Sequence, residues 1–167
     1  PEAALHALES GTRRRMDIGY LNGRLFLNVA GIGFDAAVGQ AFHERGRKGG
    51  RRGLLGYVRL SLLELRAYRA PGLVIEAGEE RLDLTAFVAT FANGPQYGSG
   101  AVINPGGKLD DGRLEVVAFE SGPLWRTMVA APRLFLGGIE RTTGYRRLVG
   151  PAATVTAMAM SAVSAAV

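Results

Sequence analysis

Two clusters of charged residues have the types and spacing that could do chemistry. The first is the vicinal pair Asp110-Asp111, which is followed by Gly112. Adjacent carboxylates at a glycine turn can bind a hard cation together with backbone carbonyl oxygens. The same residues also fit a solvated turn before a strand, because Asp and Gly are common turn residues. The local sequence favours the solvated turn and leaves the cation site as the alternative.

The second cluster is a basic, glycine-rich loop over residues 43–52, HERGRKGGRR, in which Glu44 is the one acidic residue. Arginine presents a planar fork that fits phosphate oxygens, so this loop could hold a phosphorylated ligand. A solvated loop explains the same residues equally well. Aromatic residues are not interleaved with the cluster, as the stacking platforms of a nucleic-acid interface would be. We therefore expect no nucleic-acid partner.

Several familiar sites are excluded by the sequence. The chain has no cysteine, so it has no disulfide framework and no thiolate metal site. His6 and His43 lie far apart without partners at zinc-binding spacing. The glycines of Gly31-Ile32-Gly33 form only part of a dinucleotide fingerprint, and no GxxxxGK[ST] loop is present. No serine has the context of a nucleophile elbow.

The elements that would position these residues follow from length, composition and periodicity. The 167 residues are 47% hydrophobic and carry a net charge of +5, typical of one globular domain with an anionic partner. Tight turns at Asn22-Gly23 and Gly78-Glu79 predict hairpins, and hence an antiparallel, mainly β fold with α (α+β). Strands are expected at 17–28 (a hairpin), 73–77, 82–91, 114–119 and 154–156, and the glycines of 28–35 are expected to loosen the backbone at the end of a strand. Helices are expected at 1–10, 54–69 and 121–136, the last two being the main ones.

The third helix is expected to begin at a Ser121 cap, to be kinked or shortened at Pro132 and to end at Gly137-Gly138. Residues 93–107 are predicted to form a long polar loop. Residues 157–167 carry no charge and no turn signal, which leaves open whether this tail is a strand.

Four aromatic residues lie on the two main helices: Tyr57, Tyr68, Trp125 and Phe135. Core packing is the default expectation for each of them. The alternative is a lipid pocket between a helix and the sheet.

Three stretches together resemble a known family: RLFLNVAGIGFDAAV (24–38), LLGYVRLSLLELRAY (54–68) and FANGPQYGSGAVINPGGKLDDGRLEVV (91–117). Their order and spacing resemble the carboxyl-terminal half of the diacylglycerol kinase catalytic family, the bacterial lipid kinases related to sphingosine and ceramide kinases. The resemblance covers residues 1 to about 149. It implies the antiparallel, β-sandwich-like second domain of the NAD kinase/diacylglycerol kinase fold. Residues 1–16 would then lead in from an amino-terminal nucleotide domain, and residues 17–167 would form the β-rich second domain.

The resemblance also implies site residues. KLDDG resembles a motif that holds a structural magnesium ion, with Asp111 as side-chain ligand and the backbone carbonyls of Lys108 and Arg113 assisting. Other positions match family residues near the phosphate-transfer cleft. These are Asp35 as a catalytic acidic residue, Arg51 and Arg52 in the phosphate-binding loop, and Asn93 and Gly94 in a loop that faces the cleft.

The family implies ATP- and Mg²⁺-dependent phosphate transfer to a lipid hydroxyl, such as that of diacylglycerol. It further implies a cytoplasmic protein that contacts anionic lipid at the inner membrane face. Such a protein could also form a homodimer. Neither the family's GGDGT nucleotide motif nor its later DGE motif is found in this chain. We therefore expect these 167 residues alone to be inactive. Two alternatives are a non-catalytic basic module that binds anionic lipid or nucleic acid, and an NAD kinase-like enzyme, which the LDDG run argues against.

Overall fold

The computed structural model describes residues 2–34, 36–37, 39–40, 65, 68–98, 100–158 and 162–166. The described helices are α1 Glu2–Ser10, α4 Leu124–Ala130, α5 Arg133–Leu136 and the 3₁₀ helix η1 Ile139–Arg141. The described strands are β1 Gly19–Leu21, β2 Arg24–Phe26, β3 Val29–Gly33, β4 Gly72–Ala77, β5 Glu80–Ala92, β6 Gln96–Gly98, β7 Ala101–Val102, β8 Leu114–Glu120, β9 Tyr145–Gly150, β10 Ala152–Ala157 and β11 Ala162–Ala166. The expected mainly β fold with helices is thereby confirmed.

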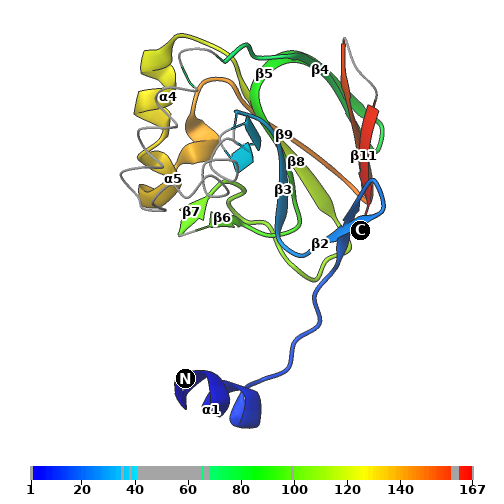
Figure 1. Ribbon diagram of the computed structural model, residues 1–167, viewed down its shortest axis with the longest axis vertical. Coiled ribbons are helices and arrows are strands. Elements are labelled where there is room, and N and C mark those ends of the chain that lie inside the picture. The colour runs from blue at the N-terminus through cyan, green and yellow to red at the C-terminus, as the bar shows by residue number, and fades with distance from the viewer. Residues whose placement is uncertain are drawn as a thin grey trace.

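Nine of these strands form one continuous hydrogen-bonded sheet that folds over on itself (Figure 1). The order is β2-β1-β11-β10-β4-β5-β8-β9, and β3 pairs with β5 beside this path. Every one of the pairings is antiparallel, as the hairpin signals predict. The short strands β6 and β7 pair separately, so the predicted polar loop 93–107 contains a small hairpin.

The long strand β5 joins the two layers of the sandwich. Its first half pairs with β4 up to Thr85, and its second half pairs with β3 and β8 from Ala86 onward. A register shift between Ala86 and Val88 marks a bulge, which bends a strand and increases its twist. The bend lets one strand serve both layers. The fully buried Phe91, Ile75 and Val116 belong to the core cluster of the sandwich.

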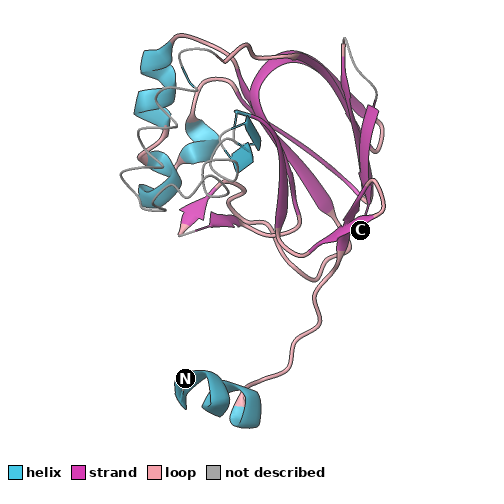
Figure 2. Cartoon of the chain, in the orientation of Figure 1, coloured by secondary structure: helices cyan, strands magenta, loops and turns pink. Residues whose placement is uncertain are grey.

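Strand β8 is buried on both faces. Its alternate residues Leu114, Val116 and Ala118 belong to the sandwich core. Val117 and Phe119 point the other way and join a second apolar cluster. Figure 2 shows helices on one side of the strands, where this second cluster lies beneath α4 and α5. The outer face of this layer is therefore built for contact with the helices.

The predicted hairpin around Asn22-Gly23 is confirmed. β1 and β2 pair in register across the turn, with φ of 48° at Asn22 and 75° at Gly23. These left-handed angles are those of the tight turns that suit the twist of two strands. The tail, left open in the sequence, forms β11, which lies between β1 and β10.

The predicted helix 121–136 is two helices. α4 ends at Ala130, and α5 begins after Pro132, which confirms the expected interruption. The predicted Ser121 cap is wrong. Pro123 is the residue before the helix, and the Ser121 backbone N–H bonds Thr85 O at 2.7 Å, so Ser121 still belongs to the sheet edge. Gly137, with φ of 87°, ends α5 as expected.

The basic loop 43–52 lies wholly outside the described residues, and so does most of the predicted helix 54–69. Within the described part of the chain, no helix is long and apolar enough to cross a membrane.

Candidate functional site

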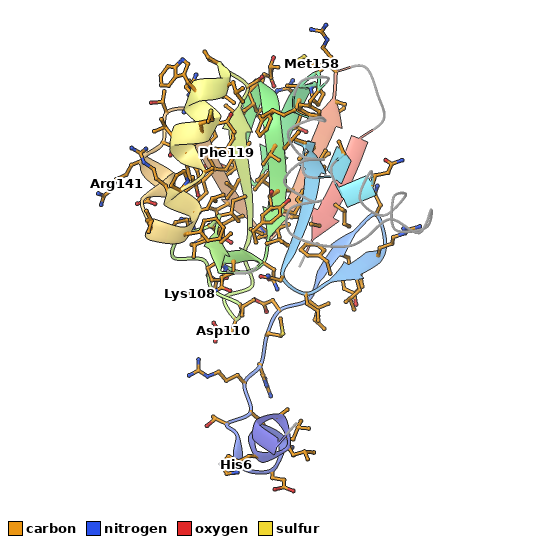
Figure 3. All side chains as sticks on the ribbon, turned by 60° about the vertical axis from the view of Figure 1, so that its left-hand side comes forward. His6, Lys108, Asp110, Phe119, Arg141 and Met158 are labelled. Carbon is orange, nitrogen blue, oxygen red and sulfur yellow. The ribbon has the colours of Figure 1, made fainter. Side chains whose placement is uncertain are left out.

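The Asp110-Asp111 turn is fastened to the segment that precedes β1. Gly112 N donates to Asp17 Oδ2 at 2.7 Å, and Arg113 N donates to Asp111 Oδ1 at 3.1 Å. Asp17 N in turn donates to Leu109 O at 2.6 Å. Two carboxylates, from distant parts of the sequence, therefore face two consecutive peptide N–H groups. Figure 3 shows Lys108 and Asp110 at this end of the domain, where the chain from α1 arrives.

Asn93 and Gly94 lie against the same segment. The Asn93 amide donates to Asp17 O and to Leu27 O, both at 2.8 Å, and the residue is completely buried. A side chain at Gly94 would come within 2.8 Å of a Leu109 methyl carbon, so only glycine fits there without displacement. The structure thus brings Asn93, Gly94 and the 108–113 turn together through Asp17. Binding of a nucleotide by Asn93 and Gly94 stays a prediction.

The turn offers the kind of ligands that a magnesium ion prefers. Carboxylate and carbonyl oxygens are hard donors, and Asp110 and Asp111 are both exposed. Among the described residues, no group of three or more His, Cys, Asp or Glu side chains is arranged to hold a metal. A cation here would therefore depend on backbone carbonyls and water beside one or two carboxylates, and the donor types present fit such a site. The roles of Asp111, Lys108 and Arg113 stay predictions.

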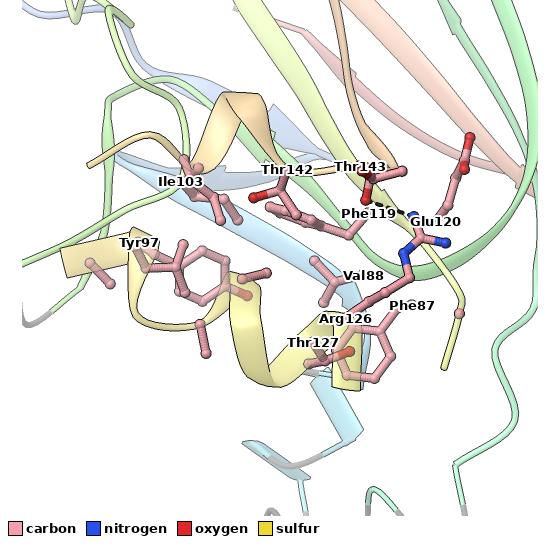
Figure 4. A pocket seen from close by; sticks show the side chains of 16 residues that line it. Phe87, Val88, Tyr97, Ile103, Phe119, Glu120, Arg126, Thr127, Thr142 and Thr143 are labelled. Carbon is pink, nitrogen blue, oxygen red and sulfur yellow. Dashed lines mark hydrogen bonds between the residues drawn. The ribbon is translucent and has the colours of Figure 1, made fainter. Parts of the chain in front are cut away.

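A separate apolar cavity of about 220 Å³ lies between the α4–α5 pair and the outer face of the sheet (Figure 4). Its floor is formed by side chains of β5 and β8, with Val88 and Phe119 among them, and one wall by Ile103 of the 93–107 loop. Ala130 of α4 and Leu134 of α5 line the opposite side. Such a space suits a hydrocarbon chain, because small-molecule pockets are mostly apolar with a few polar groups that fix orientation.

Polar groups gather at one part of the cavity lining. Arg126 Nη2 donates to Thr143 O at 2.7 Å, as the dashed line in Figure 4 marks. Glu120 also lines the cavity and pairs with Arg146 at 2.7 Å. Thr127 and Thr142 also line the cavity. A ligand with a polar head and an apolar chain would match both parts.

Tyr145 supports the cavity from behind. Its ring packs edge-on against Phe119, with ring centres 5.4 Å apart, and its hydroxyl donates to Ile103 O at 3.3 Å. Burial raises the pKa of Tyr145 to about 12. The nearby Arg147 lowers this pKa by a smaller amount, and Glu140 and Glu115 raise it slightly. The hydroxyl therefore stays protonated at neutral pH and keeps donating to the cavity wall.

The aromatic residues divide between packing and exposure. Tyr68 is partly buried and packs edge-on against Phe34 and Phe87. The default expectation of core packing is wrong for Trp125 and Phe135, which are 64% and 63% exposed. Their helices instead form a wall of the apolar cavity, which agrees with the alternative of a pocket between helix and sheet.

Three predicted residues, Asp35, Arg51 and Arg52, lie outside the described residues, as does Tyr57. Sequence reasoning missed Asp17, because a single Asp before a hairpin carries no local signal of a partner 95 positions away. It also missed the individual cavity-lining residues, which come from several segments of the chain.

A family model described as the YegS C-terminal NAD kinase beta sandwich-like domain matches residues 28–165. The chain belongs to this family. The match spans β3 through β11 and so covers both the 108–113 turn and the cavity. The resemblance noted in the sequence is thereby confirmed.

The chain is also similar to longer curated proteins. Over 141 residues it is 36% identical to a "Probable lipid kinase YegS-like" protein of Pseudomonas aeruginosa strain UCBPP-PA14, and equally to that of strain PAO1. The match covers 83% of this chain and 44% of the relative, so the chain spans less than half the length of these curated relatives.

Among solved structures, the chain resembles a diacylglycerol kinase from Bacillus anthracis str. Sterne, with a TM-score of 0.57 and 15% identity. This likeness covers 92% of the chain and 50% of that protein. At such identity it shows a shared fold.

Proposed function

We propose that this chain is the lipid-binding part of an ATP-dependent lipid kinase that transfers phosphate to a lipid hydroxyl such as that of diacylglycerol. Membership of the YegS family and the names of its relatives support a lipid kinase. The observation that carries the proposal is the apolar cavity under α4 and α5, with polar groups at one part of its lining. An acyl chain would occupy the apolar part, and the polar part would face the glycerol end.

The reaction forms a bond between the lipid oxygen and the γ-phosphorus of ATP and breaks the bond to ADP. Transfer of this kind depends on positioning and on neutralising phosphate charge. We assign the neutralising role to Arg51 and Arg52 and an acidic role near the transferred phosphate to Asp35, on the family resemblance. The hydroxyl proton passes to a base that we do not assign within this chain. Mg²⁺ at the Asp111 turn, with Lys108 and Arg113, would order the loop that also carries Asn93 and Gly94.

The cavity can be tested by filling it. Ala130 is buried on α4 and lines the cavity, so Ala130→Phe would occupy space proposed for the acyl chain. Displacing about two methylene groups at ~0.8 kcal/mol each should weaken binding of a pyrene-labelled diacylglycerol at least about tenfold. The matched control is Ala152→Phe, at an exposed position of β10 away from the cavity. Circular dichroism would verify that both variants fold.

Unchanged lipid binding by a folded Ala130→Phe variant would contradict the acyl-chain assignment. An equal loss in Ala152→Phe would contradict it too, since the effect would then not come from the cavity.

A further inference from the structure

The outer face of the α4–α5 pair exposes an unusual set of large apolar side chains. Leu136 is 86% exposed, Met128 67% and Trp125 64%. Three more apolar residues on these helices are at least half exposed: Leu124, Val129 and Phe135. Figure 1 places α4 on the side of the domain, whereas α1 and the connection after it leave from the lower end. Large apolar side chains that are exposed on one pair of helices mark a candidate interaction site.

The charged residues within α4 and α5 are all basic. Residues 121–139 contain Arg126 and Arg133 and no Asp or Glu. Arg126 donates to Thr143 O, and Arg133 Nη1 donates to Thr142 Oγ1 at 3.2 Å. Both guanidinium groups thus donate hydrogen bonds to uncharged oxygens. An apolar helix face with arginines on the side nearest the sheet complements an anionic bilayer, whose headgroups are negative and whose interior is apolar.

We propose that the outer face of α4 and α5 docks onto an anionic lipid bilayer, with Trp125, Met128 and Leu136 entering the interface. This inference rests on the proposed lipid kinase function and names the surface that would meet the membrane. Tryptophan favours the headgroup level of a bilayer, where its ring is partly apolar and its N–H stays near water. The inner side of the same helices walls the apolar cavity. A lipid leaving the bilayer at this face would therefore reach the cavity over a short path.

Trp125 is the one tryptophan of the chain, so it reports directly on this face. The probe is a vesicle of equal parts phosphatidylcholine and phosphatidylglycerol, added to the 167-residue protein. Docking should shift the Trp125 emission to shorter wavelength and protect it from acrylamide quenching. Vesicles of phosphatidylcholine alone should bind more weakly, and added salt should weaken binding to the anionic vesicles.

Two methionines provide a matched pair of variants. Met128 on α4 is 67% exposed, and Met158, after β10, is 64% exposed. Because both side chains are mainly in water, replacing either by Glu should leave the fold intact. Met128→Glu should lower the vesicle partition coefficient at least about tenfold, since burying a Met side chain is worth ~1.5–3 kcal/mol. Met158→Glu should leave the partition coefficient unchanged.

Three results would overturn the proposal. The first is an unchanged Trp125 emission with anionic vesicles, and the second is an equal loss in the two glutamate variants. The third is a blue shift that grows with protein concentration in the absence of vesicles and is abolished by Met128→Glu, which would identify a second copy as the occupant. The cavity variant Ala130→Phe should still dock on vesicles, so failure of the membrane face and failure of the acyl-chain pocket can be told apart.

Discussion

The buried carboxylate of Glu115 organises the polar contacts beneath the 93–107 loop, which forms one wall of the cavity. Glu115 of β8 is 2% exposed and accepts hydrogen bonds from Arg147 at 2.8 Å and Asn104 at 3.1 Å. Arg147 lies diagonally across the β8–β9 ladder, since Val117 is its direct partner and Glu115 faces Val149. A carboxylate taken out of water is tolerated only when it is paired and hydrogen-bonded. The pair thus fixes the position of the loop that carries Asn104 and Ile103.

We predict that Arg147→Met destabilises the protein strongly, because it leaves Glu115 buried without its positive partner. Loss of one partner of a buried pair costs ~3–5 kcal/mol, and partial exposure of the Arg147 side chain lowers the expected loss to about 2–3 kcal/mol. The neighbouring Arg146→Met is the control. Its partner Glu120 is partly exposed, so the expected loss is under ~1 kcal/mol.

Urea unfolding followed by circular dichroism would give both free energies of unfolding. Equal losses in the two arginine variants would show that the buried position of Glu115 does not set the cost. Glu115→Gln should relieve part of the loss when it is combined with Arg147→Met, since no buried charge then remains.

At the scale of residues, short motifs could be predicted from the sequence and long-range partners could not. The Asn22-Gly23 turn and the break at Pro132 follow from backbone preferences that act within a few residues. Glu115, by contrast, sits in a strand where a charge normally indicates exposure. Its burial depends on Arg147, which is 32 positions away. The same holds for Asp17, whose partner Gly112 is reached only after the chain has folded.

At the scale of elements, the tail strand β11 shows how pairing overrides weak local preference. Ala-rich segments such as 162–166 have low intrinsic strand propensity. β11 nevertheless pairs with β10 over five residue pairs and with β1 over two. It is therefore the link between the β1–β2 hairpin and the rest of the sheet. Strand β9 escaped prediction for a related reason, because Arg146 and Arg147 interrupt its apolar alternation and are matched by acidic residues on β8.

We predict that deleting residues 158–167 lowers the free energy of unfolding by at least about 3 kcal/mol, because several sheet hydrogen bonds at ~0.5–1.5 kcal/mol each are lost. The deletion should also release the β1–β2 hairpin, which native-state hydrogen exchange would detect as faster exchange at Tyr20 and Leu21. Removal of residues 2–10 is the control, since α1 lies apart from the sheet in Figure 1. An equally large effect from the control deletion, or slow exchange in the tail-deleted protein, would contradict this role of β11.

At the scale of the whole molecule, the domain presents two candidate functional sites. One is the Asp17–Asp111 corner, where the connection from α1 arrives, and the other is the cavity with its exposed helical face. α1 itself carries Leu5 and Leu8, which are 58% and 82% exposed. The curated relatives are more than twice as long as the region they share with this chain. In the lipid kinase that we propose, the phosphate donor would therefore meet the lipid at a surface that these residues supply only in part.

We predict that the 167-residue protein alone phosphorylates no lipid. The sequence contains no GGDGT or P-loop motif to hold ATP, and phosphoryl transfer without a positioned donor loses the advantage of proximity, which is worth ~7–11 kcal/mol. Incubation with radiolabelled ATP, Mg²⁺ and diacylglycerol should give no labelled lipid above the rate without protein, although the pyrene-labelled diacylglycerol should still bind.

Joining the chain to the amino-terminal part of a YegS-like relative should restore labelling, and Ala130→Phe in that fusion should remove it while Ala152→Phe should not. ATP-dependent labelling by the 167 residues alone would refute the proposal that this chain binds the lipid but needs another part to hold ATP, because both substrates would then be held by this one domain. A fusion that folds and binds both ATP and lipid but transfers no phosphate would instead refute the lipid kinase assignment itself.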